Sequence, residues 1–358
     1  MSTRTESAAR PDDALPGEPV PYRLEAGGGR RFVQRGLVSR VLATGDETAG
    51  ALAVTMVAAP PGPPIPPHFH EPRVLAEDRA PEPVALVQHD FTYCIQGRVK
   101  VWVDGECRIL GAGDAVSIAP GAVHSSQMLD HYTELLAPVV PPGWIRFLEL
   151  LSTPYDGSAY PAVDDSPLPP PERFAQAVAE GLLTPVEDFV RVEPDLDAPD
   201  DRLPGRPASY FLRAGEGPRH VLFGQVCFQL LTGAESGGRL AVTVTEGPKR
   251  PPIPRHVHER THECVLCLEG RMRIVAGGEE HRLIRGDFVS IPPGTEHTYA
   301  LESDFTRFVT MTAPTGTERL HEVAGDVAEQ RIFPPAAALP DLGRLRVAAE
   351  ELDIVWTD

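Results

Sequence analysis

An internal repeat constrains this chain more than any other feature. The tetrapeptide LAVT stands at 52–55 and again at 240–243, an offset of 188 positions. GDAVSI from Gly113 returns as GDFVSI from Gly286, an offset of 173. Between these two motifs the first copy therefore has 15 residues more than the second. Self-similarity of this kind indicates two copies of one structural module, and 358 residues are enough for two domains.

Short apolar and β-branched runs, interrupted by Gly, Pro and Asp, fill both copies. They are LAVTMV, TYCIQG, VKVWVDGE and AVSIAP in the first copy, and LAVTV, CVLCLEG, MRIVAGGEE and FVSIPPG in the second. Such runs are typical of an antiparallel sandwich or barrel. VDGE from Val103 and AGGE from Ala276 fit two-residue hairpin loops. The sequence therefore predicts an all-β fold, and the 39 prolines agree with many extended segments.

The repeat also predicts how the chain is divided. We expect a disordered N-terminal tail over 1–18, an N-terminal barrel over 19–152, an interdomain linker over 153–206, a C-terminal barrel over 207–335 and a C-terminal helix and tail over 336–358. Inside the Pro-rich linker, PERFAQAVAE predicts one short helix, because Pro171 suits the first helical position and Gly181 follows its end. A second short helix is expected from Arg344.

The strong acidity of the chain excludes several classes of partner. Its 33 basic and 51 acidic residues leave a formal charge of −18, which repels nucleic acid and anionic lipid surfaces. No apolar run approaches the roughly 18 residues of a membrane helix, and the N-terminus lacks the apolar core of a signal peptide. We therefore expect a cytoplasmic protein with no nucleic-acid or membrane partner.

The five cysteines are an odd number without framework spacing, as expected of reduced thiols. Cys264 and Cys267 form a C-x-x-C pair. Residues three apart on a strand point to opposite faces, which argues against a redox or zinc site there.

The second module carries a cluster of metal-ligand residues. His256 and His258 are two apart and project from one face of a strand. Glu263 would reach them from the next strand across a short turn, and His297 from a hairpin packed alongside. Three imidazoles and one carboxylate converging inside a barrel form a first-row transition-metal site. His262 points the other way on its strand, so we expect it at the surface or behind the ligands rather than on the metal.

The first module matches this pattern less well. His68, His70 and His124 stand at the corresponding positions, but the glutamate is missing. The 173 offset from Glu263 gives Asp90, which can ligate the same metals although its side chain is one methylene shorter. Asp90 is therefore the preferred fourth ligand of a metal site in the first barrel, and whether that site holds metal is left open.

The 15 extra residues fall between the two-histidine strand and the strand with Asp90, at about 71–88. Glu71 and Glu77 compete with Asp90 as the carboxylate ligand. We expect the insertion to alter the first metal site, since loops of this length are commonly functional or disordered. The alternative is a tolerated surface insertion, because lengthening a loop costs little free energy.

These spacings follow the two cupin motifs, G-x5-H-x-H-x4-E-x6-G and G-x5-P-x-G-x2-H, from which the second module departs only at the first glycine. The whole chain resembles the bicupin quercetin 2,3-dioxygenases, or flavonol dioxygenases, of the bacterial type. The resemblance rests on PYRLEAGGGRR, HVHERTHE, CLEGRM, GDFVSIPPGTEHTY and IFP, on STPYDG and PERFA in the linker, and on the Y-x-L-x-A-G-x-G that opens each module. It implies two jelly-roll barrels, also described as double-stranded β-helices.

The resemblance also implies a chemistry. In that family the metal binds the flavonol through its deprotonated 3-hydroxyl, and O2 then cleaves the central ring with loss of carbon monoxide. Glu263 would be both a ligand and the base that takes the hydroxyl proton. We expect a divalent transition metal, iron before manganese, copper, nickel or cobalt, although the ligand set does not select among them. The expected partners are a small aromatic substrate and O2, with a homodimer left open.

Three other classes of protein remain as alternatives. Oxalate decarboxylase-like bicupins use manganese in two complete sites, and gentisate dioxygenase-like bicupins use iron. Neither predicts the Y-x-L-x-A-G-x-G openings. The third alternative is a nonenzymatic cupin that only binds metal or a ligand.

Overall fold

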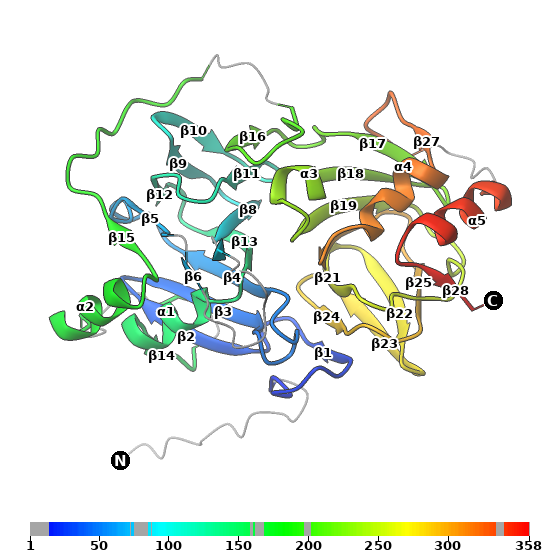
Figure 1. Cartoon of the computed structure of the whole chain (residues 1–358), viewed down its shortest axis with the longest axis horizontal. Coiled ribbons are helices and arrows are strands. Elements are labelled where there is room, and N and C mark those ends of the chain that lie inside the picture. Colours follow the sequence, from blue (N-terminus) through cyan, green and yellow to red (C-terminus); the bar gives the residue numbers. More distant parts are fainter. Residues whose placement is uncertain are drawn as a thin grey trace.

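The computed structural model describes residues 14–71, 73–74, 85–86, 88–157, 160–161, 168–196, 202–333 and 340–357. It shows two β-barrels side by side, each made of a larger and a smaller antiparallel sheet (Figure 1). The prediction of an all-β fold in two modules is confirmed. Within the described residues, no helix has the length and hydrophobicity to cross a lipid bilayer.

The first barrel is formed mainly by the first module. Its larger sheet has the order β14 (Thr153–Pro154), β2 (Arg30–Gln34), β3 (Leu37–Ala43), β4 (Ala53–Ala59), β13 (Thr133–Val140), β8 (His89–Gln96), β11 (Ala115–Ile118) and β16 (Tyr210–Leu212). Its smaller sheet has the order β10 (Glu106–Leu110), β9 (Val99–Val103), β12 (His124–Met128), β5 (His68–Phe69) and β15 (Thr184–Pro185). A separate pair, β6 (Arg73–Val74) and β7 (Ala85–Leu86), lies in the insertion.

The second barrel repeats this arrangement. Its larger sheet has the order β1 (Tyr22–Leu24), β24 (Phe288–Ile291), β21 (His262–Glu269), β26 (Thr306–Ala313), β19 (Ala241–Gly247), β18 (Gln225–Leu231), β17 (Arg219–Leu222) and β27 (Asp326–Val327). Its smaller sheet has the order β23 (Glu279–Ile284), β22 (Arg271–Ala276), β25 (His297–Leu301), β20 (His256–Val257) and β28 (Val355–Trp356).

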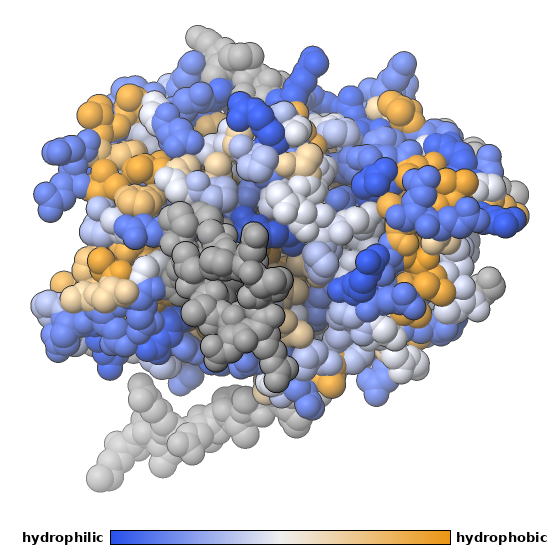
Figure 2. Space-filling view, viewed as in Figure 1, coloured by the Kyte–Doolittle hydropathy of each residue, from blue (hydrophilic) through white to orange (hydrophobic). Residues whose placement is uncertain are grey.

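Short helices cover the barrels. They are α1 (Trp144–Leu151), α2 (Pro171–Ala179), α3 (Gly233–Ser236), α4 (Leu320–Ala324), which follows the 3-10 turn η2 (Thr317–Arg319), and α5 (Leu342–Glu351). The two helices expected from the sequence are α2 and α5. The face shown in Figure 2 is largely hydrophilic. Some hydrophobic residues are exposed near α5, where they include Leu342 and Val347.

The two modules exchange their first strands. β1, from the start of the first module, pairs with β24 of the second barrel, and β16 pairs with β11 of the first. An aspartate anchors each exchanged strand, because Asp287 Oδ1 accepts from Ala26 N at 2.7 Å and Asp114 Oδ1 accepts from Ala214 N at 2.8 Å. The repeated Y-x-L-x-A-G-x-G opening is therefore the segment that ties one barrel to the other.

The outer faces of the two larger sheets pack together in one shared core. It contains Leu24 and Phe91 from the first module and Phe228 and Phe288 from the second. Each barrel also has a core of its own between its two sheets. The strands of the larger sheets are consequently buried on both faces, which explains their nearly continuous apolar runs.

β21 shows this double burial. Cys264 packs in the shared core, whereas Cys267 packs in the second barrel's own core. The two thiols therefore lie on opposite faces of the strand, as predicted. Burial raises the pKa of both, that of Cys267 to about 12. All five cysteines are free and buried.

The segments that follow the two barrels also repeat each other, although this was not predicted from the sequence. α2 and β15 precede the second barrel, α5 and β28 end the chain, and β15 pairs with β5 as β28 pairs with β20. The offset here is 171, as between the fully buried Ala177 and Ala348. The segment expected as a linker therefore completes the smaller sheet of the first barrel.

The N-terminal tail expected over 1–18 lies outside the described residues up to position 13. From there the chain is in contact with the body of the protein. Leu15 packs against the shared core, and the amide of Gly17 donates to Glu47 Oε1 at 3.0 Å.

Asp287→Ala should lower the free energy of unfolding by about 2 to 4 kcal/mol. The carboxylate is buried, and its loss removes the acceptor for the amides of Ala26 and Ile284 and for the guanidinium of Arg23. Chemical denaturation followed by fluorescence measures the change. Asp304→Ala, on an exposed turn, is the matched control and should stay within about 0.5 kcal/mol; equal effects of the two substitutions would contradict the anchoring role.

Candidate metal centres

The second barrel brings the four residues predicted as ligands together. His256 and His297 are direct partners on the neighbouring strands β20 and β25, so their side chains share a face. His258 follows β20, and Glu263 reaches across from β21 in the larger sheet. One nitrogen of each histidine and one oxygen of Glu263 lie within 4.8 Å of one another. This is a donor set that could hold a metal ion.

Backbone carbonyls orient the three imidazoles. Nδ1 of His256 lies 3.0 Å from Pro254 O, Nδ1 of His258 lies 2.7 Å from Asp353 O, and Nδ1 of His297 lies 2.9 Å from Thr295 O. A carbonyl oxygen only accepts hydrogen bonds, so each Nδ1 carries a proton and donates it. Nε2 is then the nitrogen that faces the other ligands, which is the arrangement that metal-binding histidines use.

The electrostatics of the second centre agree with an ionised carboxylate. Glu263 Oε2 lies 3.3 Å from His258 Nε2 and 3.1 Å from His297 Nε2. Burial raises the pKa of the Glu263 carboxyl, but the closely placed imidazoles of His258 and His297 outweigh it and hold the pKa well below its usual range. Burial and the neighbouring histidines lower the pKa of His256 far below its usual value. With Nδ1 protonated and Nε2 free, the three imidazoles and the Glu263 carboxylate would offer a divalent cation three nitrogens and one negative oxygen.

Asp353, from the C-terminal segment, supports this centre in two ways. Its backbone carbonyl holds His258, and its carboxylate accepts from the amides of Glu259, Arg260 and Thr261 at 3.1, 2.9 and 2.8 Å. Those three residues form the turn that links His258 to Glu263. Although burial raises the pKa of Asp353, these hydrogen bonds lower it overall. This supporting role of Asp353 was not predicted from the sequence.

The first barrel contains a related cluster of three histidines. Donor nitrogens of His68, His70 and His124 lie within 4.8 Å of one another, and His68 and His124 are direct partners across β5 and β12. Nδ1 of His68 lies 2.8 Å from Pro66 O, Nδ1 of His70 lies 2.7 Å from Leu182 O, and Nδ1 of His124 lies 3.0 Å from Ala122 O. Burial and the neighbouring imidazoles lower the pKa of His68 to about 3. This barrel therefore has a second candidate centre.

Asp90 lies beside this cluster, but only one of its carboxylate oxygens faces the histidines; the other binds Gln88. Its Oδ2 is 3.2 Å from His70 Nε2 and 3.9 Å from His124 Nε2, and it does not join the set of mutually close donors. Its Oδ1 accepts from Gln88 Nε2 at 2.7 Å. Asp90 as fourth ligand stays a prediction. Gln88 belongs to the insertion, so the end of the insertion contacts the candidate ligand.

Of the two competing carboxylates, Glu71 is exposed and accepts from Thr184 Oγ1 at 3.0 Å. Glu77 lies outside the described residues, as do positions 72, 75–84 and 87 of the insertion. That the insertion alters the first site stays a prediction, and the contact between Gln88 and Asp90 is where the two meet.

His262 is not a surface residue. It is buried on the side of β21 opposite Glu263, and its Nε2 lies 2.8 Å from Ser290 Oγ. His89 makes the same contact with Ser117 Oγ in the first barrel. Burial lowers the pKa of His262 to about 4. The surface alternative was wrong because the second barrel packs this face of the strand against the first.

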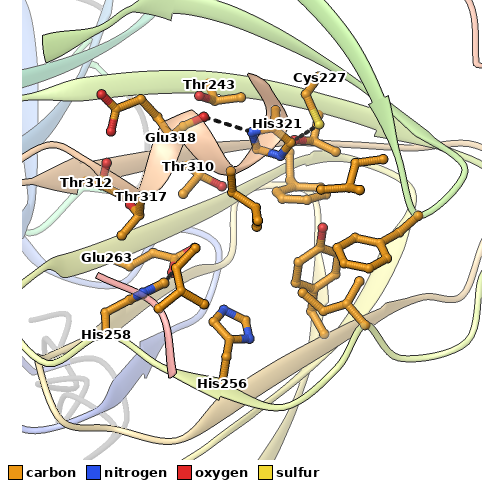
Figure 3. A pocket seen from close by; sticks show the side chains of 18 residues that line it. Cys227, Thr243, His256, His258, Glu263, Thr310, Thr312, Thr317, Glu318 and His321 are labelled. Carbon is orange, nitrogen blue, oxygen red and sulfur yellow. Dashed lines mark hydrogen bonds and ion pairs between the residues drawn. The ribbon is translucent and has the colours of Figure 1, made fainter. Parts of the chain in front are cut away.

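A cavity opens beside the second centre. Figure 3 shows His256, His258 and Glu263 on one side of it. Apolar side chains such as Ile253 and Phe308 form part of its lining, together with several threonines. The metal ligands therefore border a space where a substrate could bind.

Comparisons with known proteins agree with this architecture. The family model described as "Cupin domain" matches residues 87–128 and 242–312, one segment in each barrel. Quercetin 2,3-dioxygenase of Bacillus subtilis is 28% identical over 341 residues, which cover 95% of this chain and 96% of that protein.

Solved structures with the same fold include two oxalate decarboxylases. The enzyme of Lactobacillus farciminis, in complex with formate, is 14% identical with a TM-score of 0.50, and the match covers 83% of this chain and 89% of that chain. A variant of the Bacillus subtilis enzyme is 16% identical with a TM-score of 0.52, over 82% of this chain and 77% of that chain. At these identities the similarity concerns the fold alone.

His256→Ala should lower the metal content by about one ion per chain, because it removes one of three inward-facing nitrogens. Elemental analysis of the purified protein measures this directly. His68→Ala is the matched variant in the first barrel, and its effect shows whether the first centre is also occupied. Unchanged metal content in the His256 variant would contradict the assignment of the second centre.

Asp353→Ala should weaken metal binding at the second centre by about 10- to 100-fold, since it frees the turn between His258 and Glu263. Competition with a chelator of known affinity gives the dissociation constant. Glu351→Ala, exposed on the same segment, is the control and should not change it. Equal affinities in the two variants would show that the carboxylate does not support the centre.

Proposed function

Because this chain is a bicupin with a histidine-rich candidate metal centre in each barrel, we propose that it is a metal-dependent dioxygenase of the quercetinase type. The reaction would cleave the central ring of a flavonol with O2, placing both oxygen atoms in the ring-opened ester and releasing one ring carbon as carbon monoxide. One observation carries the proposal: three oriented Nε2 atoms and the Glu263 carboxylate converge beside a cavity. The similarity to quercetin 2,3-dioxygenase along nearly the whole chain supports it.

The residues of the second centre have separate tasks in this proposal. His256, His258 and His297 would hold the ion through Nε2, in orientations fixed by their carbonyl partners. A bound divalent metal would lower the pKa of a coordinated substrate hydroxyl. The Glu263 carboxylate lies beside the same nitrogens and would accept the proton of the coordinated hydroxyl.

We assign the reaction to the second barrel rather than the first. The ligand set of the second barrel matches the cupin motif with a glutamate, whereas Asp90 in the first barrel is shorter and engages Gln88. We keep iron first among the metals, although nitrogen and oxygen donors suit manganese, copper, nickel and cobalt as well.

The size of the cavity favours a second candidate function. Its volume is about 70 Å³, against roughly 300 Å³ or more for typical pockets of drug-sized ligands. A three-ring flavonol would therefore require wall side chains to move. A smaller aromatic compound or a small acid would need less movement, so an oxygenase or decarboxylase for such a substrate is the alternative.

Anaerobic mixing with quercetin separates these functions. The metal-loaded protein should shift the flavonol absorbance, and the metal-free protein should not. Admission of O2 should then bleach the flavonol and release carbon monoxide. A metal-loaded protein that leaves the spectrum of quercetin unchanged would refute the flavonol proposal and favour the smaller substrate or a binding protein.

Glu263→Gln should reduce flavonol turnover by about 10²- to 10⁴-fold, because an amide cannot accept the substrate proton. Metal content should be partly kept, since the amide oxygen can still coordinate. Asp90→Asn is the matched variant in the first barrel and should leave turnover nearly unchanged. Steady-state assays on both proteins measure the difference, and turnover of the Glu263 variant within a few-fold of the original protein would refute the base role.

A further inference from the structure

The cavity of the second barrel has a polar side remote from the metal ligands. Figure 3 shows His321 and Glu318 across the pocket from His256, His258 and Glu263. These two residues come from η2 and α4, which lie at the end of the barrel. The cupin metal motifs include none of this side, so its chemistry calls for a separate explanation.

The first barrel provides an internal comparison, because five of the polar positions of the cavity are apolar there. The strand registers confirm the equivalence: Ala53 pairs with Val139 and Ala241 pairs with Thr312. By the repeat offsets, the second barrel has Thr245, Thr310, Thr312, Glu318 and His321 where the first has Val57, Ala137, Val139, Ile145 and Leu148. The two barrels thus share their candidate ligand histidines but differ in polarity at these five positions.

The same comparison explains where the cavity comes from. In the first barrel Trp144 lies with its ring 6.0 Å from that of His70, and it stacks on Phe147 at 4.2 Å. The position equivalent to Trp144 in the second barrel is Thr317, which lines the cavity. A large aromatic side chain has therefore been replaced by a small hydroxyl-bearing one.

Two hydroxyls at the cavity have unmet hydrogen-bonding capacity. Thr312 and Thr317 are more than nine-tenths buried, and their Oγ1 atoms have no hydrogen-bond partner among the described residues. Buried hydroxyls are nearly always bonded in folded proteins. Because both residues line the cavity, a polar group bound there would supply the missing partner.

The orientation of His321 defines what it can bind. Its Nδ1 lies 3.3 Å from the carbonyl oxygen of Glu318, to which it can only donate. Burial lowers its pKa to about 4, so the ring is neutral near pH 7. In that tautomer Nε2 carries a lone pair and accepts a hydrogen bond. The natural partner of a neutral acceptor of this kind is a hydroxyl group.

We propose that His321 is a specificity-determining residue of the second barrel, where it accepts a hydrogen bond from a substrate hydroxyl remote from the metal-bound end. Thr312 and Thr317 complete this subsite. The preferred substrate is then a polyhydroxylated aromatic compound rather than one with a single metal-binding hydroxyl. The inference rests on the proposed function, since it requires that the cavity beside the metal centre binds substrate.

The test compares quercetin, which has hydroxyls on every part of the molecule, with 3-hydroxyflavone, which has only the metal-binding hydroxyl. His321→Leu should lower kcat/KM for quercetin by about 10-fold or more and change that for 3-hydroxyflavone by less than twofold. Anaerobic titrations that follow the flavonol absorbance should show the same selective loss in affinity. His321→Gln keeps an oxygen acceptor and should recover most of the quercetin activity.

Controls separate this role from a structural one. His281→Leu removes another histidine of the second barrel, on β23, that does not line the cavity, and it should not change the ratio between the two substrates. Metal content and melting temperature should match in all variants, and Leu148 shows that a leucine is accommodated at the equivalent place.

Each result has one meaning. If the His321→Leu substitution lowers kcat/KM equally for both substrates, or for neither, the inference is overturned and the proposed function stands. If the original metal-loaded protein neither binds nor cleaves either flavonol, the proposed function and the inference built on it are both wrong.

Discussion

The reciprocal exchange of first strands is the interaction on which the rest of the molecule depends. Each exchanged strand adds to the larger sheet of the other barrel. Asp287 accepts from the backbone just after β1, and Asp114 accepts from the backbone just after β16. The outer faces of both larger sheets are thereby held together in one core. Because β21 carries Glu263 on one face and Cys264 in that core on the other, the position of this candidate ligand depends on how the barrels pack.

Local spacing was sufficient to predict the residues of the candidate metal centre in the second barrel. The alternation of side chains on a strand places His256 and His258 on one side of β20 and sends His262 to the opposite side of β21, as the structure shows. The repeat offset was sufficient to predict that a second, similar cluster exists at His68, His70 and His124. These features follow from contacts between residues that are near in sequence or related by the repeat.

The parts that could not be predicted depend on contacts between distant segments. β1 pairs with a strand more than 260 residues away, and Asp353 caps a turn more than 90 residues before it. His262 is buried because the other barrel covers it, which periodicity within one strand does not indicate. The weak similarity between PERFAQAVAE and the helix near Ala348 was the available signal for the repeat of the segments that follow the barrels, and Pro-rich surroundings obscured it.

A comparison of the two barrels separates metal binding from substrate recognition. Both barrels orient three imidazoles through backbone carbonyls, so the ability to bind a cation depends on a framework that the two copies share. They differ on the other side of the interior, where Trp144, Ile145 and Leu148 correspond to Thr317, Glu318 and His321. A metal ion with similar ligands in both barrels would therefore face Trp144, Ile145 and Leu148 in one barrel and Thr317, Glu318 and His321 in the other. On our proposal, the residues across from the metal, rather than its ligands, would decide which barrel binds the substrate.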